Sequence, residues 1–175
     1  MRNKTHGKNE IIKIYTNNIM ATYRNVQPKL YDDCITHVSV WRSIEEYIPR
    51  DKAIWCPFYF NGNHTLRELD YEIIHEDRDF FTYTPEYDII VDNPPFSIKK
   101  KILERLKEID KPFILLMPVS TICYNYFKAF KDIQIIVPSK RINFAPQLGS
   151  SATFDTLFYC YKMNLPKDII FLEPS

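Results

Sequence analysis

Short apolar runs and amphipathic stretches alternate along the chain, and a proline or a polar cluster follows most of the runs. Apolar runs of about four to eight residues, rich in β-branched and aromatic side chains, are typical of buried strands. These runs predict strands at residues 53–58, 71–74, 87–91, 113–117, 133–137 and 154–161. Apolar positions three and four residues apart predict helices at residues 38–47, 65–69, 98–109 and 120–130. Because strands and helices alternate, we expect an α/β fold with a mostly parallel sheet and helices on both faces.

The two ends of the chain carry weaker patterns. Residues 1–30 show little periodicity beyond a short helix near 11–20, and residues 168–172 form a short extended tail. A chain of 175 residues is long enough to bury one real core. We therefore expect an N-terminal arm at 1–30 and a single domain at 31–175.

The apolar runs are too short to cross a bilayer, and the first ten residues are polar and basic. A membrane span needs about 20 apolar residues, and a secretory signal needs an apolar central region. The sequence therefore predicts a protein that is neither secreted nor membrane-bound. We expect it in the cytoplasm, or in the nucleus or a viral factory if it comes from a eukaryotic virus.

The charge balance does not favour nucleic-acid binding by bulk attraction, because 23 basic and 22 acidic residues give a net charge of +1. It leaves room for local basic patches. The candidate nucleic-acid contacts are Lys99, Lys100, Lys140 and Arg141. Each of these side chains can equally be part of a solvated surface.

Cysteine and histidine positions show no metal-site spacing. The four cysteines are widely scattered, which fits neither a zinc site nor a small disulfide framework and favours reduced thiols. Cys56 has no obvious activating partner in the sequence, so an ordinary buried thiol is favoured. Structural or surface roles are favoured for His37, His64 and His75, and no metal is predicted.

The predicted strands end in polar or proline-containing segments. These endings are residues 56–58, 75–77, 92–96 and 117–118. In an open parallel sheet, ligands bind outside the carboxyl ends of the strands. We therefore expect the four endings to lie on one rim and to form the site.

The segment Asn93-Pro94-Pro95-Phe96 carries the clearest chemistry. Neither proline has an N–H group, so the segment presents hydrogen-bond acceptors. The Asn93 amide oxygen and the Pro94 carbonyl can accept both hydrogens of an exocyclic amino group, which aims the nitrogen lone pair at an electrophile. Phe96 offers a face on which a planar ring can stack. A double proline can also simply end a strand, which is the alternative reading.

Residues 93–96 resemble the (D/N/S)-P-P-(Y/F/W) motif of S-adenosylmethionine-dependent amino-methyltransferases. That family includes DNA adenine-N6 and cytosine-N4 enzymes and some RNA and protein-glutamine enzymes. The resemblance covers roughly residues 31–163, and the stretch IWCPF at 54–58 is similar to small Dam-like proteins of phages and mobile elements. It implies a Rossmann-like class I methyltransferase fold, with a seven-stranded, mostly parallel sheet whose last strand is antiparallel.

The resemblance also implies where S-adenosyl-L-methionine binds. Thr36 would contact its methionine end, Glu76 or Asp77 its ribose, and Asp79 with Phe80 its adenine. The cofactor loop and the residue beside it would supply Cys56, Pro57, Phe58, Gly62 and Asn93. The sequence departs from the family here, because Cys56 stands where an acid is usual and Gly62 is the single remaining glycine of this loop.

The resemblance predicts methyl transfer to an exocyclic amino group, with N6 of adenine in DNA as the favoured substrate. Two alternatives stay open. One is a catalytically weakened methyltransferase fold that serves as a binding or regulatory subunit. The other keeps the chemistry and changes the substrate to RNA or a protein glutamine. Nucleic acid is the expected partner, and both a homodimer and a complex with a partner subunit are compatible with the sequence.

Overall fold

The structure is a computed structural model, and it describes residues 34–59, 62–142, 144–146 and 155–174. The predicted arm at 1–30 and the predicted helix near 11–20 lie outside the described residues. Within the described residues, no helix combines the length and the hydrophobicity needed to cross a membrane.

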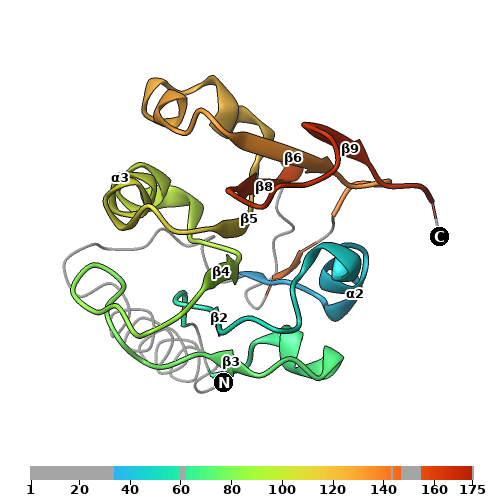
Figure 1. Cartoon of the computed structure of the whole chain (residues 1–175). Coiled ribbons are helices and arrows are strands. Elements are labelled where there is room, and N and C mark those ends of the chain that lie inside the picture. The colour runs from blue at the N-terminus through green and yellow to red at the C-terminus, as the bar shows by residue number, and fades with distance from the viewer. Residues whose placement is uncertain (1–33, 60–61, 143, 147–154, 175) are drawn as a thin grey trace, which may run out of the picture.

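Seven strands form one sheet in the order β3-β2-β4-β5-β8-β6-β9 (Figure 1). The strands are β2 (Ile54–Trp55), β3 (Ile73–Ile74), β4 (Ile89–Asp92), β5 (Phe113–Pro118), β6 (Ile133–Val137), β8 (Thr156–Tyr161) and β9 (Ile169–Phe171). Strand β8 is antiparallel to both of its neighbours, β5 and β6, and every other pairing in this sheet is parallel. The predicted fold class is therefore confirmed: a Rossmann-like, seven-stranded, mostly parallel sheet.

The seventh strand, β9, comes from the segment predicted as an extended tail. It follows the antiparallel strand along the chain and pairs parallel with β6 at the end of the sheet. A separate two-stranded sheet pairs β1 (Cys34–Ile35) with β7 (Ala145–Pro146).

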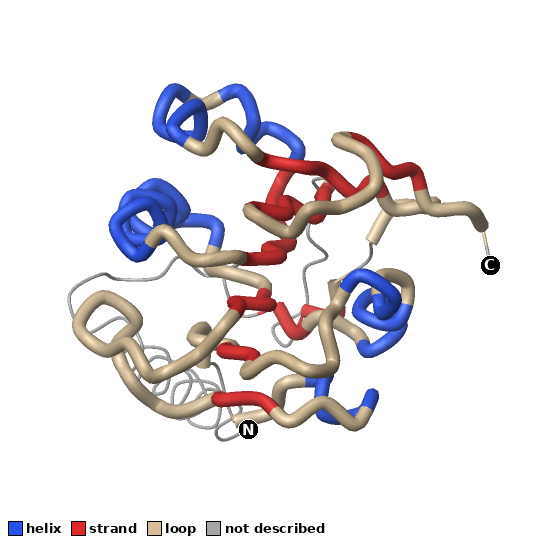
Figure 2. Tube along the Cα trace, viewed as in Figure 1, coloured by secondary structure: helices blue, strands red, loops and turns tan. Residues whose placement is uncertain are grey.

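The side chains of alternate residues in the central strands pack into two apolar cores, one on each face of the sheet. Along β5, Ile114 and Leu116 face one core, whereas Phe113, Leu115 and Met117 face the other. The helices α2 (Val38–Arg42) and η2 (Thr65–Leu69) cover the first face, and α3 (Lys99–Ile109) and η5 (Asn125–Ala129) cover the second. Figure 2 shows these helices on opposite sides of the strands. Helices on both faces force the binding rim to the edge of the sheet.

Two predicted helices are interrupted in the structure. The helix predicted at 120–130 is two 3₁₀ helices, η4 (Val119–Cys123) and η5, separated by Tyr124 in an extended conformation (φ −81°, ψ 142°). This segment is rich in β-branched and aromatic residues, which favour α-helix weakly. The hydroxyl of Tyr159 also donates to the carbonyls of Pro118 and Val119 at 2.9 and 3.1 Å, which fixes the start of the segment.

The helix predicted at 38–47 likewise divides into α2 and η1 (Glu45–Tyr47). The break falls at Ile44, whose φ of −120° and ψ of 14° lie outside the helical region. The helix predicted at 98–109 is confirmed as α3, and a short 3₁₀ helix, η3 (Phe96–Ile98), leads into it.

Candidate active site

The ends of β2, β3 and β4 meet as predicted. The amide of Cys56 donates to the carbonyl of Ile74 at 2.9 Å, and a ring nitrogen of His75 lies 2.7 Å from the carbonyl of Cys56. The amide of Phe58 donates to the carboxylate of Asp92 at 2.8 Å. Because these strands are parallel, their carboxyl ends form one rim.

The segment from Asn93 to Phe96 leaves β4 at this rim. Pro94 and Pro95 are buried, whereas Asn93 and Phe96 are half-buried. The ring of Phe96 lies 6.2 Å from the ring of Phe144, at an interplanar angle of 78°. The two prolines thus form the floor of the site. Asn93 and Phe96 are each partly exposed as residues, and the amide oxygen of Asn93 is itself buried at this floor.

Asp92 joins the two halves of the rim. Its carboxylate is 4% exposed and accepts hydrogen bonds from the amides of Phe58 and Asn93, at 2.8 and 2.7 Å. A ring nitrogen of His64 lies 3.2 Å from the same carboxylate. A buried carboxylate is stable only when such donors replace its water. Asp92 therefore fixes the loop after β2 against the Asn-Pro-Pro-Phe segment.

The contacts of His64 define its tautomer. Its Nδ1 accepts from the amide of Leu66 at 3.3 Å, so the proton of a neutral ring is on Nε2, which faces Asp92. The ring also stacks on Trp41, with centroids 5.7 Å apart. His64 is thus a structural residue, as predicted, and its role is to orient the Asp92 carboxylate.

His75 ends β3 and lies against the same loop. Its Nδ1 faces the Cys56 carbonyl and so donates to it, and its ring lies 4.9 Å from Tyr59 and 5.3 Å from His64. Its Nε2 is buried and has no hydrogen-bond partner among the described residues. Such an atom is suited to accept a hydrogen bond from a bound polar group.

Cys56 is an unreactive thiol, as predicted. It is fully buried, and its Sγ donates to the carbonyl of Val91 at 3.1 Å. Burial, followed by the nearby charge of Asp92, raises the pKa of the Cys56 thiol well above its ordinary value. The thiol remains neutral, so Cys56 does not supply the negative charge of the acid that the resembled methyltransferases carry at this position.

The residues predicted to hold the ribose and the adenine follow β3 in order. Glu76 and Asp77 are exposed, and Glu76 accepts a hydrogen bond from the hydroxyl of Tyr83 at 2.8 Å. The Asp79 carboxylate accepts from the amide of Phe81 at 3.0 Å and so caps a turn. Phe80 is fully buried.

The ring of Phe80 lies 5.1 Å from Phe58 and 5.6 Å from Trp55. It therefore lies in the core beneath the rim and supports Phe58 from below. The structure thus brings the predicted cofactor residues Phe58 and Phe80 into contact, and their roles toward a cofactor stay predictions.

Thr36 lies beside the same loop although it is far from it in sequence. The hydroxyl of Thr65 donates to the Thr36 carbonyl at 2.7 Å, and the Thr36 hydroxyl is buried without a partner among the described residues. This contact places Thr36 next to His64 and so on the cofactor side of the rim. Its role in binding methionine remains a prediction.

The four basic residues predicted to contact nucleic acid divide between two segments. Lys99 and Lys100 begin α3, directly after the motif, and the Lys99 ammonium lies 3.4 Å from the Phe96 carbonyl. Lys140 and Arg141 are exposed, and Arg141 pairs with Asp155 at 3.3 Å. The contact between Phe96 and Phe144 brings the second segment toward the motif.

Sequence patterns placed Asp92 on the rim only as part of the segment 92–96, with no individual role, and assigned structural or surface roles to His64 and His75 without their partners. Asp92 and His64 are 28 residues apart, and Asp92 and Phe58 are 34 residues apart. One signal was available: an acid as the last residue of an apolar strand is buried, and a buried acid needs donors.

Among the described residues, no group of three or more His, Cys, Asp or Glu side chains could hold a metal ion.

Gly62 is required by the shape of the loop after β2. Its φ is +82°, and a Cβ built there would lie 2.8 Å from the hydroxyl of Tyr59. We expect Gly62→Ala to destabilise the protein by about 1–2 kcal/mol, through the left-handed backbone and this contact. Urea denaturation would measure the loss. The same change in a Tyr59→Phe background should cost less, and an unchanged midpoint would contradict the assignment.

Burial lowers the pKa of His75 below its ordinary value of 6.5. The unfolded chain then binds a proton more readily than the folded protein, so folding stability should fall as the pH drops below about 6.5. In His75→Asn the amide nitrogen can still donate to the Cys56 carbonyl but does not titrate. We expect urea midpoints measured between about pH 7 and pH 5 to fall less for this variant than for the wild type. Equal slopes would contradict this.

No protein-family model and no curated protein matches this chain. Among solved structures, the chain is similar to the crystal structure of a protein from Pyrococcus horikoshii that is described as a candidate RNA methyltransferase. The TM-score is 0.37 and the identity 11%, over 70% of this chain and 78% of that chain. A similarity this weak does not indicate an activity for this chain.

Proposed function

We propose that this protein is an S-adenosylmethionine-dependent methyltransferase that acts on an exocyclic amino group, with N6 of adenine in DNA as the favoured substrate. The observation that carries the proposal is the position of Asn93-Pro94-Pro95-Phe96. The segment directly follows β4 at the carboxyl rim, with its prolines and the Asn93 amide oxygen buried and with Asn93 and Phe96 half-buried as residues. Ligands of open α/β sheets bind at this edge.

The residues on the other side of the rim carry the kinds of polar groups that could bind the cofactor. Exposed carboxylates at Glu76 and Asp77 suit a ribose diol. The Nε2 of His75 and the hydroxyl of Thr36 are buried and have no hydrogen-bond partner among the described residues. Buried polar atoms of this kind can form their hydrogen bonds with a bound ligand. When bound, S-adenosylmethionine supplies an electrophilic methyl group. These four residues are the ones that would hold it.

The protein's own contribution is to position the target amine. The Asn93 amide oxygen and the Pro94 carbonyl accept its two hydrogens, so that the nitrogen lone pair points toward the electrophile. Phe96 stacks on the base, and such stacking is worth about 1–3 kcal/mol. No strong base is needed, since the proton can leave after attack; catalysis then comes from positioning and electrostatics. An adenine in a duplex has to be extruded to reach these groups.

Basic side chains beside the motif support a nucleic-acid substrate. Lys99 and Lys100 begin the helix that follows Phe96, and phosphate contacts there would position a strand over the site. The near-neutral net charge of +1 means that this attraction is local. We therefore expect binding to weaken with salt less steeply than for a strongly basic protein.

Transfer of a labelled methyl group tests the proposal. The full chain is incubated with S-adenosylmethionine carrying a tritiated methyl group and, separately, with DNA, RNA and protein. We expect label in DNA, recovered as N6-methyladenine after digestion to nucleosides. Label in RNA or in protein glutamine would keep the chemistry and correct the substrate. No label in any pool would contradict methyl transfer.

One observation favours a second candidate, a methyltransferase fold that works as a binding or regulatory subunit. The Cys56 thiol is buried, neutral and hydrogen-bonded to Val91, so the loop after β2 lacks the acid that the family uses. This candidate would be supported if the chain binds nucleic acid, with or without the cofactor, but transfers no methyl group when the cofactor is present.

A further inference from the structure

No other described strand pairs with the outer edge of β9, and this strand carries the most exposed large apolar side chains of the described sheet. The strand closes the sheet order beyond β6, at the end away from β3 (Figure 1). Ile169 is 53% exposed and Phe171 is 70% exposed, and both side chains lie on the same face of the strand. Exposed apolar edge strands are sites at which a second strand pairs.

The backbone of β9 is oriented for such pairing. The carbonyl of Asp168 and the amide of Leu172 both bond to β6, at 2.8 and 3.0 Å. Backbone groups of alternate residues point to the same side of a strand, so the N–H and C=O groups of Ile169 and Phe171 point outward. In an antiparallel pair, two residues with outward groups exchange both hydrogen bonds when they lie opposite each other.

The sequence around this strand is complementary to itself. We propose that two copies of this chain pair through β9, antiparallel and centred on Ile170, to form one continuous sheet. In this register Ile169 lies opposite Phe171 of the second copy, so the outward backbone groups and the exposed apolar side chains match. Lys167 comes within reach of Glu173 of the second copy, and the two-fold axis repeats this contact.

The charges at the two ends of the strand are available for that contact. Lys167 and Glu173 are both exposed, and neither forms an ion pair with another described residue. Opposite charges facing each other across two strands stabilise the pairing, whereas like charges oppose it. A parallel arrangement of the two strands would bring each charge near its own kind, so the charges favour the antiparallel arrangement.

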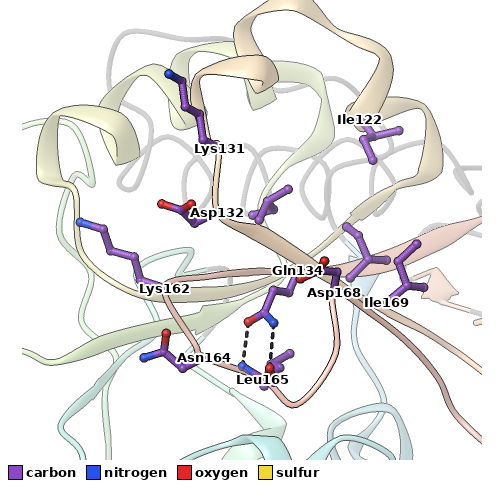
Figure 3. A pocket seen from close by; sticks show the side chains of 11 residues that line it. Ile122, Lys131, Asp132, Gln134, Lys162, Asn164, Leu165, Asp168 and Ile169 are labelled. Carbon is purple, nitrogen blue, oxygen red and sulfur yellow. Dashed lines mark hydrogen bonds between the residues drawn. The ribbon is translucent and has the colours of Figure 1, made fainter.

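A hollow beside β9 offers room for the partner's side chain. It has a volume of about 980 Å³ and is lined on its apolar side by Ile122, Ile133, Ile135 and Ile169 (Figure 3). The Gln134 side chain closes one wall through hydrogen bonds to Leu165, at 2.7 and 2.9 Å. In the proposed register, Phe171 of the second copy lies beside Ile169 and so at the rim of this hollow.

The pairing also determines how the two candidate sites are arranged. β9 is parallel to β6, and β6 runs in the same direction as β4 and β5 because β8 is antiparallel to both of its neighbours. An antiparallel β9 pair therefore directs the two carboxyl rims to opposite edges of the joined sheet. Each copy then acts on its own substrate, and the dimer is independent of the methyl-transfer chemistry.

Reversal of the two charges tests the proposed register. Sedimentation velocity over a concentration series should show a monomer–dimer equilibrium for the full wild-type chain. Lys167→Glu or Glu173→Lys alone should raise the dimer dissociation constant about tenfold or more, since each places like charges together at both ends. The double variant K167E/E173K should restore the wild-type value. Lys128→Glu makes the same charge change as Lys167→Glu at an exposed position of η5; it is the control for that variant and should have no effect.

A crosslink gives a second, independent test. The residue on the two-fold axis faces itself as a non-hydrogen-bonded pair, whose Cα atoms lie about 4.5 Å apart, within the range of a disulfide. Oxidised Ile170→Cys should thus form a covalent dimer, whereas Ile169→Cys should crosslink only when mixed with Phe171→Cys. A wild-type chain that stays monomeric over the whole concentration series would overturn the proposal. Single charge variants that dimerise normally, or an Ile170→Cys variant that does not crosslink, would also overturn it.

Discussion

Replacing Asn93 by alanine is expected to reduce methyl transfer at least about 100-fold while the protein stays folded. The alanine side chain removes the amide oxygen that accepts one hydrogen of the target amine, so the nitrogen lone pair is no longer aimed. Asn93 is half-buried and lies outside β4, so its side chain is not part of that strand. The measurement is the initial rate of label transfer from S-adenosylmethionine, together with the urea midpoint of the variant.

Two further variants make this result specific. Asn93→Asp keeps an oxygen acceptor and matches another residue that the resembled motif allows, so it should retain more activity than Asn93→Ala. Asn125→Ala truncates an exposed amide on η5 and should leave the rate unchanged. Full activity of Asn93→Ala would refute the role of Asn93, even if the wild type is an active methyltransferase.

Replacing Asp92 by alanine is expected to have the largest effect on stability, a loss of about 3 kcal/mol. The carboxylate accepts from the amides of Phe58 and Asn93 and faces the Nε2 of His64. Without the carboxylate, these three donors lose their acceptor. Water cannot easily replace it, because the Asp92 side chain is only 4% exposed. Equilibrium urea denaturation measures the loss.

The loss of stability on replacing Asp92 should depend on the hydrogen-bonding groups of the new side chain and not only on its volume. Asp92→Asn keeps the shape and one oxygen acceptor but turns an NH₂ group toward donors, so its loss should be smaller than that of alanine and clearly measurable. Asp51→Ala, at an exposed carboxylate, is the control and should change the midpoint little. If Asp92→Ala is as stable as this control, Asp92 does not hold the two halves of the rim together.

The sequence was sufficient for much of the fold because local patterns carry it. Apolar runs closed by prolines, as in 113–117 and 133–137, placed the central strands within a residue or two. The alternation with helices such as α3 then implied a parallel sheet, whose carboxyl ends share a rim. The rim was therefore predictable, and with it the position of the Asn-Pro-Pro-Phe segment.

The remaining features depend on contacts between distant residues. The Asp92–His64 and Asp92–Phe58 hydrogen bonds join segments that no periodicity relates, so the contacts of Asp92 could not be predicted from its place in the rim segment 92–96. The break at Tyr124 falls in a segment of weak helix propensity, whose start is held by the hydrogen bonds of Tyr159 to Pro118 and Val119. Residues 168–172 were predicted as an extended tail, and it is the pairing with β6 that makes Ile169–Phe171 a strand of the sheet.

Titration calorimetry of the wild-type chain with S-adenosylmethionine tests the central claim most directly, because cofactor binding precedes any transfer. We predict saturable binding with one site per chain, and weaker binding by a Glu76→Ala, Asp77→Ala double variant, whose removed carboxylates are exposed and do not support the core. An absence of binding at millimolar cofactor would contradict the claim that this rim is the active site of a methyltransferase.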